Sequence, residues 1–473
     1  MVKLYPIPET VEKCRHFSIM VNGQSAEAYS CTVSAVPFNR CWPGYQRPID
    51  QTEDASFVYF DTDESVSIEL EACKDFSDLK IRPLSKNIKA TVSNRKISFS
   101  AGVGHYTVEL DGHHNALHIF INPIKEYNID KDSEDVIYFA PGVHNPGLIE
   151  LKSGQTVFID GGAVVHGSVY SAETDNIKII GRGIIDNSTY ERFTYRPMDL
   201  KRCRNVEVEG IIFKDANEWT LTAMNCDNLI IDNAKAIGMW RYNADGFDIC
   251  NSANVIIKNC FLRTFDDGIV LKGIKIVYNG KNLGFDLRNV ENHLVENCVL
   301  WCDWGKALEL GAETCADEYF NITYRNCDII HADSVALDIQ NGDRAYVHDV
   351  KYEDINVEYS KYSTGGMIQE SDEQKYTPGK EPHVPQLIHA EIFDCVWSQD
   401  KQRGRIEGVK YKNITVYADE GLKLPPMAFK GFSAEHSVKD IEIENIVING
   451  KRYCDKSDFE FEENEFANNI KLK

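Results

Sequence analysis

Three aspartates in two similar segments are the residues of this chain whose types and spacing best suit acid–base chemistry. Asp245 is followed by Gly246, and Asp266-Asp267 is followed by Gly268. Aligning the two Asp-Gly pairs places Asp245 and Asp267 22 residues apart. Neighbouring carboxylates resist simultaneous ionisation, so we expect a raised pKa on at least one of the three. A protonated carboxyl group beside an ionised one can donate one proton and accept another.

A six-residue repeat supplies the elements that must hold these aspartates. Each copy opens with Asn, Asp or Gly, continues with apolar residues at alternate positions, and closes with Asn, Gly or Asp. It is typical of a short strand closed by residues that tolerate the left-handed backbone conformation of a sharp turn. His293 breaks the apolar rule in the fifth copy. Nine copies occur, at residues 176–181, 205–210, 228–233, 254–259, 292–297, 321–326, 349–354, 408–413 and 440–445.

The spacing of the copies predicts the fold class. Successive copies start 23 to 59 residues apart, and residues 273–291 and 360–404 supply the extra length of the two longest steps. Such a period indicates a solenoid. Long helical patterns are absent, so a helical solenoid fits badly. We therefore predict an all-β protein in which the coils of a right-handed parallel β-helix stack on one another.

The residue that follows each copy supports this register. We expect these residues to form an inward-facing apolar column, in which the three cysteines are small core residues rather than metal or redox groups. The first copy departs, with Arg182 at this position. The column reads Ile211, Ala234, Cys260, Cys298, Cys327, Ile355, Ile414 and Ile446.

A different pattern precedes residue 135. Short alternating segments such as Phe57–Phe60, Lys96–Ser100 and His105–Leu110 are separated by turn residues. This arrangement is typical of an antiparallel β-sandwich. We therefore predict an N-terminal β-sandwich over residues 1–135, a parallel β-helix over 136–455 and a C-terminal tail over 456–473.

Charge and composition limit the partners. The net charge of −22, without a run of Lys or Arg, argues against nucleic acid and anionic membranes. The opening MVKLYPIPETVEKCRHFSIM has no apolar signal segment, and no segment is long enough to span a bilayer. If the chain is complete, its 14 cysteines fit a reducing, cytoplasmic compartment. A secreted form whose signal had been removed would look the same, and the oligomeric state stays open.

On adjacent coils, the Cα atoms of Asp245 and Asp267 should be about 4.8 Å apart. Inverting glycosidases use such stacked carboxylates, because one acid protonates the leaving oxygen while another carboxylate activates water. We therefore predict that Asp245, Asp266 and Asp267 are catalytic and act on a sugar polymer without a cofactor. No His/Cys cluster accompanies them, so we expect no metal. The predicted substrate-binding residues are Trp219, Trp240, Arg241, Asn243, Lys272, Lys306 and Glu309.

The segments Asn243-Ala244-Asp245 and Asp266-Asp267 resemble the catalytic motifs of polygalacturonases, glycoside hydrolase family 28. They also resemble those of the dextranase and isopullulanase family, glycoside hydrolase family 49. The resemblance spans about residues 140–450 and is specific mainly between 217 and 345. It implies a parallel β-helix that hydrolyses an α-linked oligo- or polysaccharide with inversion. It also implies that Asp266 is the general acid, while Asp245 and Asp267 position and activate water.

Two departures bear on the substrate. Polygalacturonases continue with Gly-His-Gly and then Arg-x-Lys, where this chain has Trp304-Gly305-Lys306 and Asp338-Ile339-Gln340. The missing Arg-x-Lys removes the usual clamp for a galacturonate carboxylate and argues against pectin. The stretch from Asp266 to Lys272, and a β-sandwich placed before the β-helix, look closer to the dextranase group. Lys272 and Lys306 could still contact an acidic sugar.

Two other functions stay open. A polysaccharide lyase would use the three aspartates as a calcium cluster and Lys272 as the base. A non-catalytic glycan-binding β-helix would keep aromatic platforms but has no need for three stacked carboxylates. We expect the insertions at 273–291 and 360–404 to wall off one end of a groove, which favours cleavage at chain ends. His331 and His348 are expected at the surface.

Overall fold

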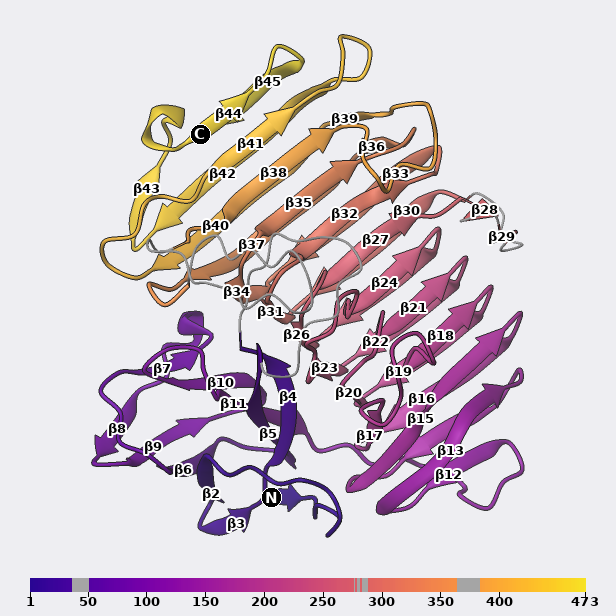
Figure 1. Ribbon diagram of the computed structural model, residues 1–473, viewed down its shortest axis with the longest axis vertical. Coiled ribbons are helices and arrows are strands. Elements are labelled where there is room, and N and C mark those ends of the chain that lie inside the picture. The colour runs from indigo at the N-terminus through magenta and orange to yellow at the C-terminus, as the bar shows by residue number, and fades with distance from the viewer. Residues whose placement is uncertain (36–50, 276, 279–280, 283–287, 364–382) are drawn as a thin grey trace.

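The computed structural model describes residues 1–35, 51–275, 277–278, 281–282, 288–363 and 383–473. The regular secondary structure of this part of the chain is almost entirely β-strand, together with the short 3-10 helices η2 (Leu84–Lys86) and η3 (Lys456–Asp458). Figure 1 shows a tall coil of stacked strands with a smaller strand-rich body against its lower side. The predicted all-β fold, a right-handed parallel β-helix preceded by a β-sandwich, is confirmed.

The smaller body is a two-layered β-sandwich. Alternating apolar residues of both layers, including Ile19, Ile68, Ile97 and Ile119, share one buried core. One layer is β3 (Gln24–Ala26), β2 (Phe17–Val21), β6 (Val66–Ala72), β9 (Lys96–Ala101) and β8 (Ala90–Ser93). The other is β1 (Val2–Leu4), β5 (Thr52–Thr62), β11 (Leu117–Pro123), β10 (Gly104–Leu110) and β7 (Leu79–Arg82), with β4 (Tyr29–Ser34) also paired to β5.

The tall coil has three faces, and the predicted repeat forms the one that we call face A. Its strands pair in parallel, each with the equivalent strand of the next coil. They are β12 (Val136–Phe139), β14 (Thr156–Ile159), β16 (Asp175–Gly181), β19 (Arg204–Glu209), β22 (Asp227–Asp232), β25 (Ala253–Lys258), β30 (Val290–Glu296), β33 (Glu318–Arg325), β37 (Val350–Tyr359), β40 (Lys410–Ala418), β42 (Val438–Ile448) and β45 (Ala467–Leu472).

Within a complete coil the chain runs from face A to face C and then to face B, which turns toward the viewer in Figure 1. Its strands are β13 (Gly142–Leu151), β15 (Ala163–Ala172), β18 (Met198–Lys201), β21 (Leu221–Met224), β24 (Phe247–Cys250), β27 (Ile269–Gly273), β32 (Lys306–Thr314), β35 (Val335–Asn341), β38 (Gln386–Ile392), β41 (Met427–Lys430) and β44 (Phe461–Glu463).

Face C is shorter and lies toward the sandwich. Its strands are β17 (Ile184–Asp186), β20 (Ile212–Lys214), β23 (Lys235–Ile237), β26 (Phe261–Thr264), β31 (Val299–Cys302) and β34 (Asp328–Ala332). The remaining described strands are β36 (Tyr346–His348), β39 (Arg405–Glu407), β43 (Lys451–Tyr453) and the hairpin of β28 (Val277–Tyr278) and β29 (Lys281–Asn282).

The residues that open and close the repeat adopt the backbone conformation expected of them. Asn176, Asn205, Asn228 and Asn254 have φ between 54° and 57°. Their side chains also join the coils, because the amide of Asn205 donates to Asn176 at 3.2 Å and that of Asn228 donates to Asn205 at 2.6 Å. The turns are therefore fixed by local conformation and by an amide ladder that crosses the coils.

The inward column also has the expected register. Cys260, Cys298 and Cys327 are all buried in the core of the β-helix. Aromatic rings stack in the same way on face A, where the ring centroids of Tyr324 and Tyr352 are 4.8 Å apart. Repetition of the same residue type at the same position in each coil thus fills the interior with stacked layers.

The sandwich packs on face C through a third apolar core that includes Tyr29, Phe57, Phe261 and Trp301. His331 lies at this interface, and the prediction that it is a surface residue is wrong, since it is only 7% exposed. It bonds to Glu109 of the sandwich, which also pairs with Arg82. A repeat pattern describes contacts along the β-helix, but it gives no information about a second body packed against it.

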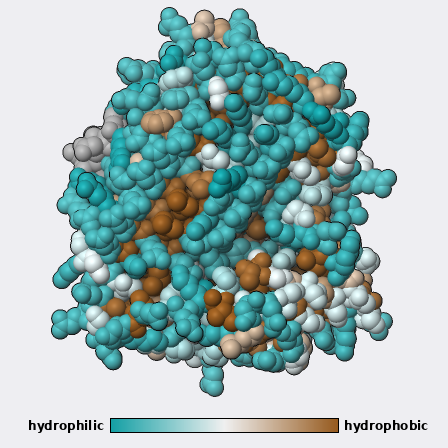
Figure 2. Space-filling model, turned by 180° about the vertical axis from the view of Figure 1, so that it is seen from behind, coloured by the Kyte–Doolittle hydropathy of each residue, from teal (hydrophilic) through white to brown (hydrophobic). Residues whose placement is uncertain are grey.

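The β-helix extends past residue 455. β44 pairs with β41 and β45 pairs with β42, so residues 456–473, expected as a tail, carry its last strands. No helix in the described ranges is long and apolar enough to cross a bilayer. From behind, the surface is mostly hydrophilic, with hydrophobic residues gathered in a diagonal stripe (Figure 2).

Candidate active site

A pocket on the outward side of face B brings together eight of the ten predicted site residues. It lies over β24, β27 and β32, at the centre of the face. Buried polar groups converge there on an open cavity, as in most ligand sites. Its lining residues are Trp219, Asn243, Asp245, Asp266, Asp267, Lys272, Trp304, Lys306, Glu309, Ala312, Glu313 and Trp397.

The three aspartates lie on adjacent coils, as their spacing predicts. Each precedes a strand of face B, and Phe247 of β24 pairs with Ile269 of β27. The N–H of Gly246 donates to the carbonyl oxygen of Asp267 at 2.8 Å. Asp245 and Asp267 therefore occupy equivalent positions in neighbouring coils, and Asp266 adds its carboxyl group next to them.

Two lysines bind this carboxylate cluster. The Lys272 Nζ lies 3.1 Å from Asp245 Oδ2, 2.8 Å from Asp248 Oδ1 and 4.0 Å from Asp267 Oδ2. The Lys306 Nζ lies 3.7 Å from Asp267 Oδ1 and 3.4 Å from Glu309 Oε1. Although burial opposes charge, the carboxylates raise the pKa of both lysines, which therefore stay cationic.

Asp266 and Asp267 differ in protonation. Burial and the charge of Asp267 raise the pKa of Asp266 to about 8. Burial acts in the same direction on Asp267, but Lys306 and Lys272 outweigh it and lower the pKa of that carboxyl group. The backbone N–H of Lys306 also donates to Asp267 Oδ1 at 3.1 Å. At neutral pH the pair therefore holds one proton, on Asp266.

The other carboxyl groups of the pocket also differ in how far their pKa values are raised. Burial raises the pKa of Asp245 and of Glu309 well above the usual range, and neighbouring carboxylates add to the effect. The pKa of Asp248 rises, through burial, only to about 6 because Lys272 opposes the shift. The two lysine cations thus favour the ionised form of Asp248 and Asp267, which they contact.

Gly305 explains one departure from the polygalacturonase pattern. A Cβ atom at this position would lie 2.4 Å from the backbone nitrogen of Asp267 and 2.5 Å from its Oδ1. Atoms do not approach this closely without moving the backbone. Position 305 therefore has no room for any side chain, and the backbone of this coil packs directly on the two aspartates.

Two predicted residues do not line the pocket. Arg241 forms an ion pair with Asp215, and its guanidinium lies 4.5 Å from the ring centroid of Trp240. Trp219 does line the pocket, but the Lys272 Nζ lies 4.1 Å from its ring centroid and Arg196 lies 4.7 Å from it. Its ring therefore helps to hold Lys272 in addition to facing the pocket.

Sequence reasoning missed Trp304, Glu313, Trp397 and the Lys272 partner Asp248 as site residues. Asp248 could have been found, since it lies two residues into the strand that follows Asp245 and faces the same way as Lys272. Trp397 carried no such signal. It lies within the longest step between repeats, from residue 349 to residue 408, and spacing alone cannot place a residue of that segment.

The position of the missing Arg-x-Lys holds a different group. Asp338 pairs in register with Glu309 on one side and His389 on the other. Its carboxylate accepts from Gln340 at 2.8 Å and lies 2.7 Å from His389 Nδ1. Although burial opposes charge, Asp338 and Glu391 raise the pKa of His389 to about 9. A cation is present here, but it lies between two carboxylates of the protein.

Fold and site together define a β-helical glycoside hydrolase. The family model for glycosyl hydrolases family 28 matches residues 148–396, and the chain belongs to this family. No curated protein sequence matches the chain significantly.

Solved structures resemble the whole chain in fold. Dex49A from Penicillium minioluteum has a TM-score of 0.62 at 14% identity, with 98% of this chain and 96% of that chain covered. The family 28 exopolygalacturonase of Yersinia enterocolitica has a TM-score of 0.50 at 12% identity, with 100% and 96% covered. At these identities the likeness concerns the fold alone.

Proposed function

We propose that this protein hydrolyses a neutral, α-linked oligo- or polysaccharide with inversion at the anomeric carbon and without a metal. The observation that carries the proposal is that Lys272 and Lys306 lie against Asp267 and lower its pKa, while burial and Asp267 raise the pKa of Asp266. A proton donor and a proton acceptor lie in one pocket, and inverting hydrolysis requires both. The α linkage and the inversion also follow the predicted resemblance to families 28 and 49.

In the proposed reaction, the Asp266 carboxyl group gives its proton to the glycosidic oxygen as the bond to the anomeric carbon breaks. A water molecule attacks that carbon from the opposite side, and its proton passes to Asp267, with Asp245 helping to orient the water. The products are a free leaving alcohol and a sugar of inverted anomeric configuration. Proton exchange with solvent then returns both carboxyl groups to their starting states.

Charge balance supports a neutral sugar. Both pocket lysines lie within 4.0 Å of Asp267, and Lys272 is also 2.8 Å from ionised Asp248. An entering uronate would compete with these carboxylates for the same cations. At the position of the missing clamp, the His389 cation is already held by Asp338 and Glu391. Lys272 and Lys306 were predicted to bind the substrate. In the proposed mechanism they instead stabilise the charge of the catalytic carboxylates.

A neighbouring hollow on face B extends the pocket over earlier coils. Trp219 lines both hollows, and the second also contains Tyr170, Tyr195, Arg196 and Lys201. Aromatic and polar side chains along one groove suit several linked sugar rings better than a single one. The groove therefore supports an oligomeric substrate.

The test is a hydrolysis screen of neutral α-linked oligosaccharides against oligogalacturonides, in excess chelator, with wild type and Asp267→Asn in parallel. The expected result is release of reducing sugar from a neutral substrate by the wild type alone. Cleavage of oligogalacturonides alone would contradict the proposal of a neutral substrate and would indicate a polygalacturonase. Activity that depends on calcium and yields an unsaturated, ultraviolet-absorbing product would identify a lyase instead.

A further inference from the structure

The loop between β38 and β39 brings a tryptophan to the catalytic pocket from outside the repeat. β38 ends at Ile392 and β39 begins at Arg405. Trp397 of this loop lines the same pocket as Asp266 and Asp267. No strand holds this residue, so the interactions of the loop must hold it in place.

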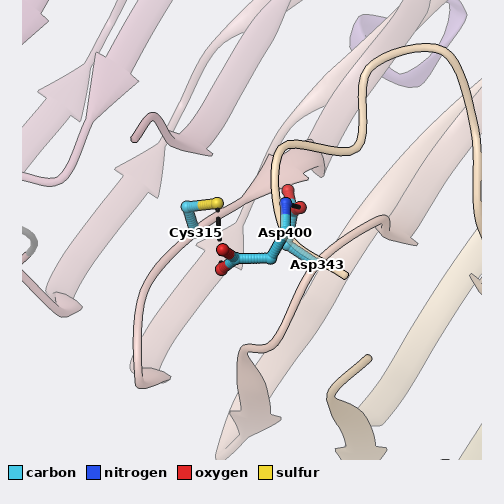
Figure 3. A group of neighbouring side chains, drawn as sticks. All are labelled: Cys315, Asp343 and Asp400. Carbon is cyan, nitrogen blue, oxygen red and sulfur yellow. Dashed lines mark hydrogen bonds between the residues drawn. The ribbon is translucent and has the colours of Figure 1, made fainter. Parts of the chain in front are cut away.

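Asp343, in the turn after β35, fixes the loop. Its Oδ1 accepts from the backbone N–H groups of Gln399 at 2.6 Å and Asp400 at 2.5 Å, while its Oδ2 accepts from that of Thr314 at 2.9 Å. Its own carbonyl oxygen accepts from the N–H of Gly404 at 2.7 Å. One side chain thus ties the loop to the end of β32. Figure 3 shows Asp343 beside Asp400 and Cys315.

Further contacts reach the coil that carries the catalytic residues. Gln399 Oε1 accepts from the backbone N–H of Lys275, which follows β27, at 2.5 Å. The Lys275 Nζ lies 3.3 Å from Asp400 Oδ1. The loop therefore folds back along the edge where the strands of face B end. Asp266 and Asp267 stand at the opposite edge, where β27 begins.

The donor atoms of Cys315, Asp343 and Asp400 lie close enough to hold a metal ion. Their existing partners indicate a structural role instead. Asp343 accepts three backbone N–H groups, and Asp400 Oδ2 lies 3.3 Å from both Arg344 Nη1 and Cys315 Sγ. Burial and the two carboxylates raise the pKa of Cys315, which keeps the thiol protonated, and a metal needs the thiolate.

We propose that Trp397 contacts the substrate directly, by packing its indole ring against the apolar C–H face of a sugar, and that Asp343 is its positioning residue. This inference rests on the proposed function. An indole ring offers a large, rigid apolar surface at low entropic cost, which suits a neutral sugar and gives no advantage to a carboxylate. The sugar would lie between Trp397 at one edge of face B and the two aspartates at the other.

The test compares Trp397→Ala, Asp343→Ala and the double variant on the substrate that the wild type cleaves. Trp397→Ala should raise KM by about tenfold or more, because an aromatic contact is lost, while kcat changes by less than about threefold. Asp343→Ala should raise KM to a similar extent. The double variant should be no worse than the worse single one, because both act through the same contact. Val396→Ala is the control, since Val396 is adjacent in the loop and 82% exposed.

An unchanged KM in Trp397→Ala would overturn the substrate contact, and additive losses in the double variant would overturn the positioning role of Asp343. A binding experiment that needs no turnover uses Asp266→Asn and the same oligosaccharides, with the change in tryptophan fluorescence as the measure of binding. Trp397→Ala in that background should weaken binding by a similar factor. If the wild type cleaves nothing but this binding difference persists, the proposed hydrolysis fails while the sugar contact stands. If the wild type cleaves none of the oligosaccharides and Asp266→Asn binds none of them, both the proposed hydrolysis and the proposed sugar contact fail.

Discussion

Asp266 and Asp267 are consecutive in the chain, yet the protein raises the pKa of the first to about 8 and lowers that of the second. Both are buried, so burial alone does not separate them. The difference arises because Lys306 and Lys272 act more strongly on Asp267 than on Asp266. A pair of carboxyl groups with separated pKa values is the signature of an acid and a base assigned to different tasks.

The first prediction concerns the role of Asp266. Asp266→Asn should lower kcat by about 10²–10⁴-fold, because an amide cannot donate the acidic proton. Substrates with an activated leaving group need less protonation, so they should restore much of the activity of this variant. They should not restore Asp245→Asn or Asp267→Asn. Equal rescue of all three variants, measured as kcat on matched substrates, would contradict the assignment.

The second prediction concerns pH. Asp266 must be protonated to act, so kcat/KM should fall as the pH rises through about 8, the pKa of that group. Asp267 must be ionised, and its lowered pKa keeps it ionised throughout this pH range. The residual activity of Asp266→Asn should lack the alkaline fall. A rate that stays level through pH 9 in the wild type would show that Asp266 is not the acid.

The third prediction concerns stability and follows from the same shift. Because the folded-state pKa of Asp266 is raised, its contribution to the free energy of unfolding is fully present below the unfolded-state value and is lost as the pH rises through about 8. Asn does not ionise, so Asp266→Asn should not lose stability in this pH range. At pH 9 the variant should therefore melt at a higher temperature than the wild type, whereas at pH 5 the difference should shrink. A lower melting temperature at pH 9 would argue against a strained, buried Asp266.

The fourth prediction concerns Gly305. Gly305→Ala should lower activity severely, because the new Cβ atom would lie 2.4 Å from the backbone of Asp267 and displace the catalytic pair. Gly102→Ala in the sandwich is the control, since nothing lies within 4 Å of that added atom. Circular dichroism should show the same strand content in both variants. Full activity of Gly305→Ala would mean that the two aspartates tolerate displacement.

The fold could be predicted from the sequence because the β-helix repeats itself. Asn254 adopts a left-handed conformation, as the opening residues of the other copies do, and its amide donates to Asp227 of the preceding coil at 2.8 Å, so nine weak signals reinforce one another. The relative register of Asp245 and Asp267 then follows directly. Alignment of two consecutive coils therefore suffices to bring these two proposed catalytic residues together.

What the sequence did not provide lies outside the repeat. His331 faces the sandwich, and contact between two separate bodies leaves no periodic pattern in either. Trp397 lines the pocket from an irregular loop, whose Gln399 and Asp400 backbone N–H groups donate to Asp343, and the path of such a loop leaves no repeating pattern in the sequence. The predicted wall of a groove remains a prediction for residues 273–291 and 360–404, because residues 276, 279–280, 283–287 and 364–382 lie outside the described part of the chain.

The most direct test of the proposed inverting mechanism is the anomeric configuration of the first-formed product. It can be measured by proton NMR during hydrolysis of the neutral α-linked substrate that the screen identifies. With Asp266 as acid and Asp267 as the base that activates water, the first product should be the β anomer, and the α anomer should appear only later through mutarotation. An α anomer formed first would mean retention and a covalent intermediate. That result would contradict the roles assigned here to Asp266 and Asp267.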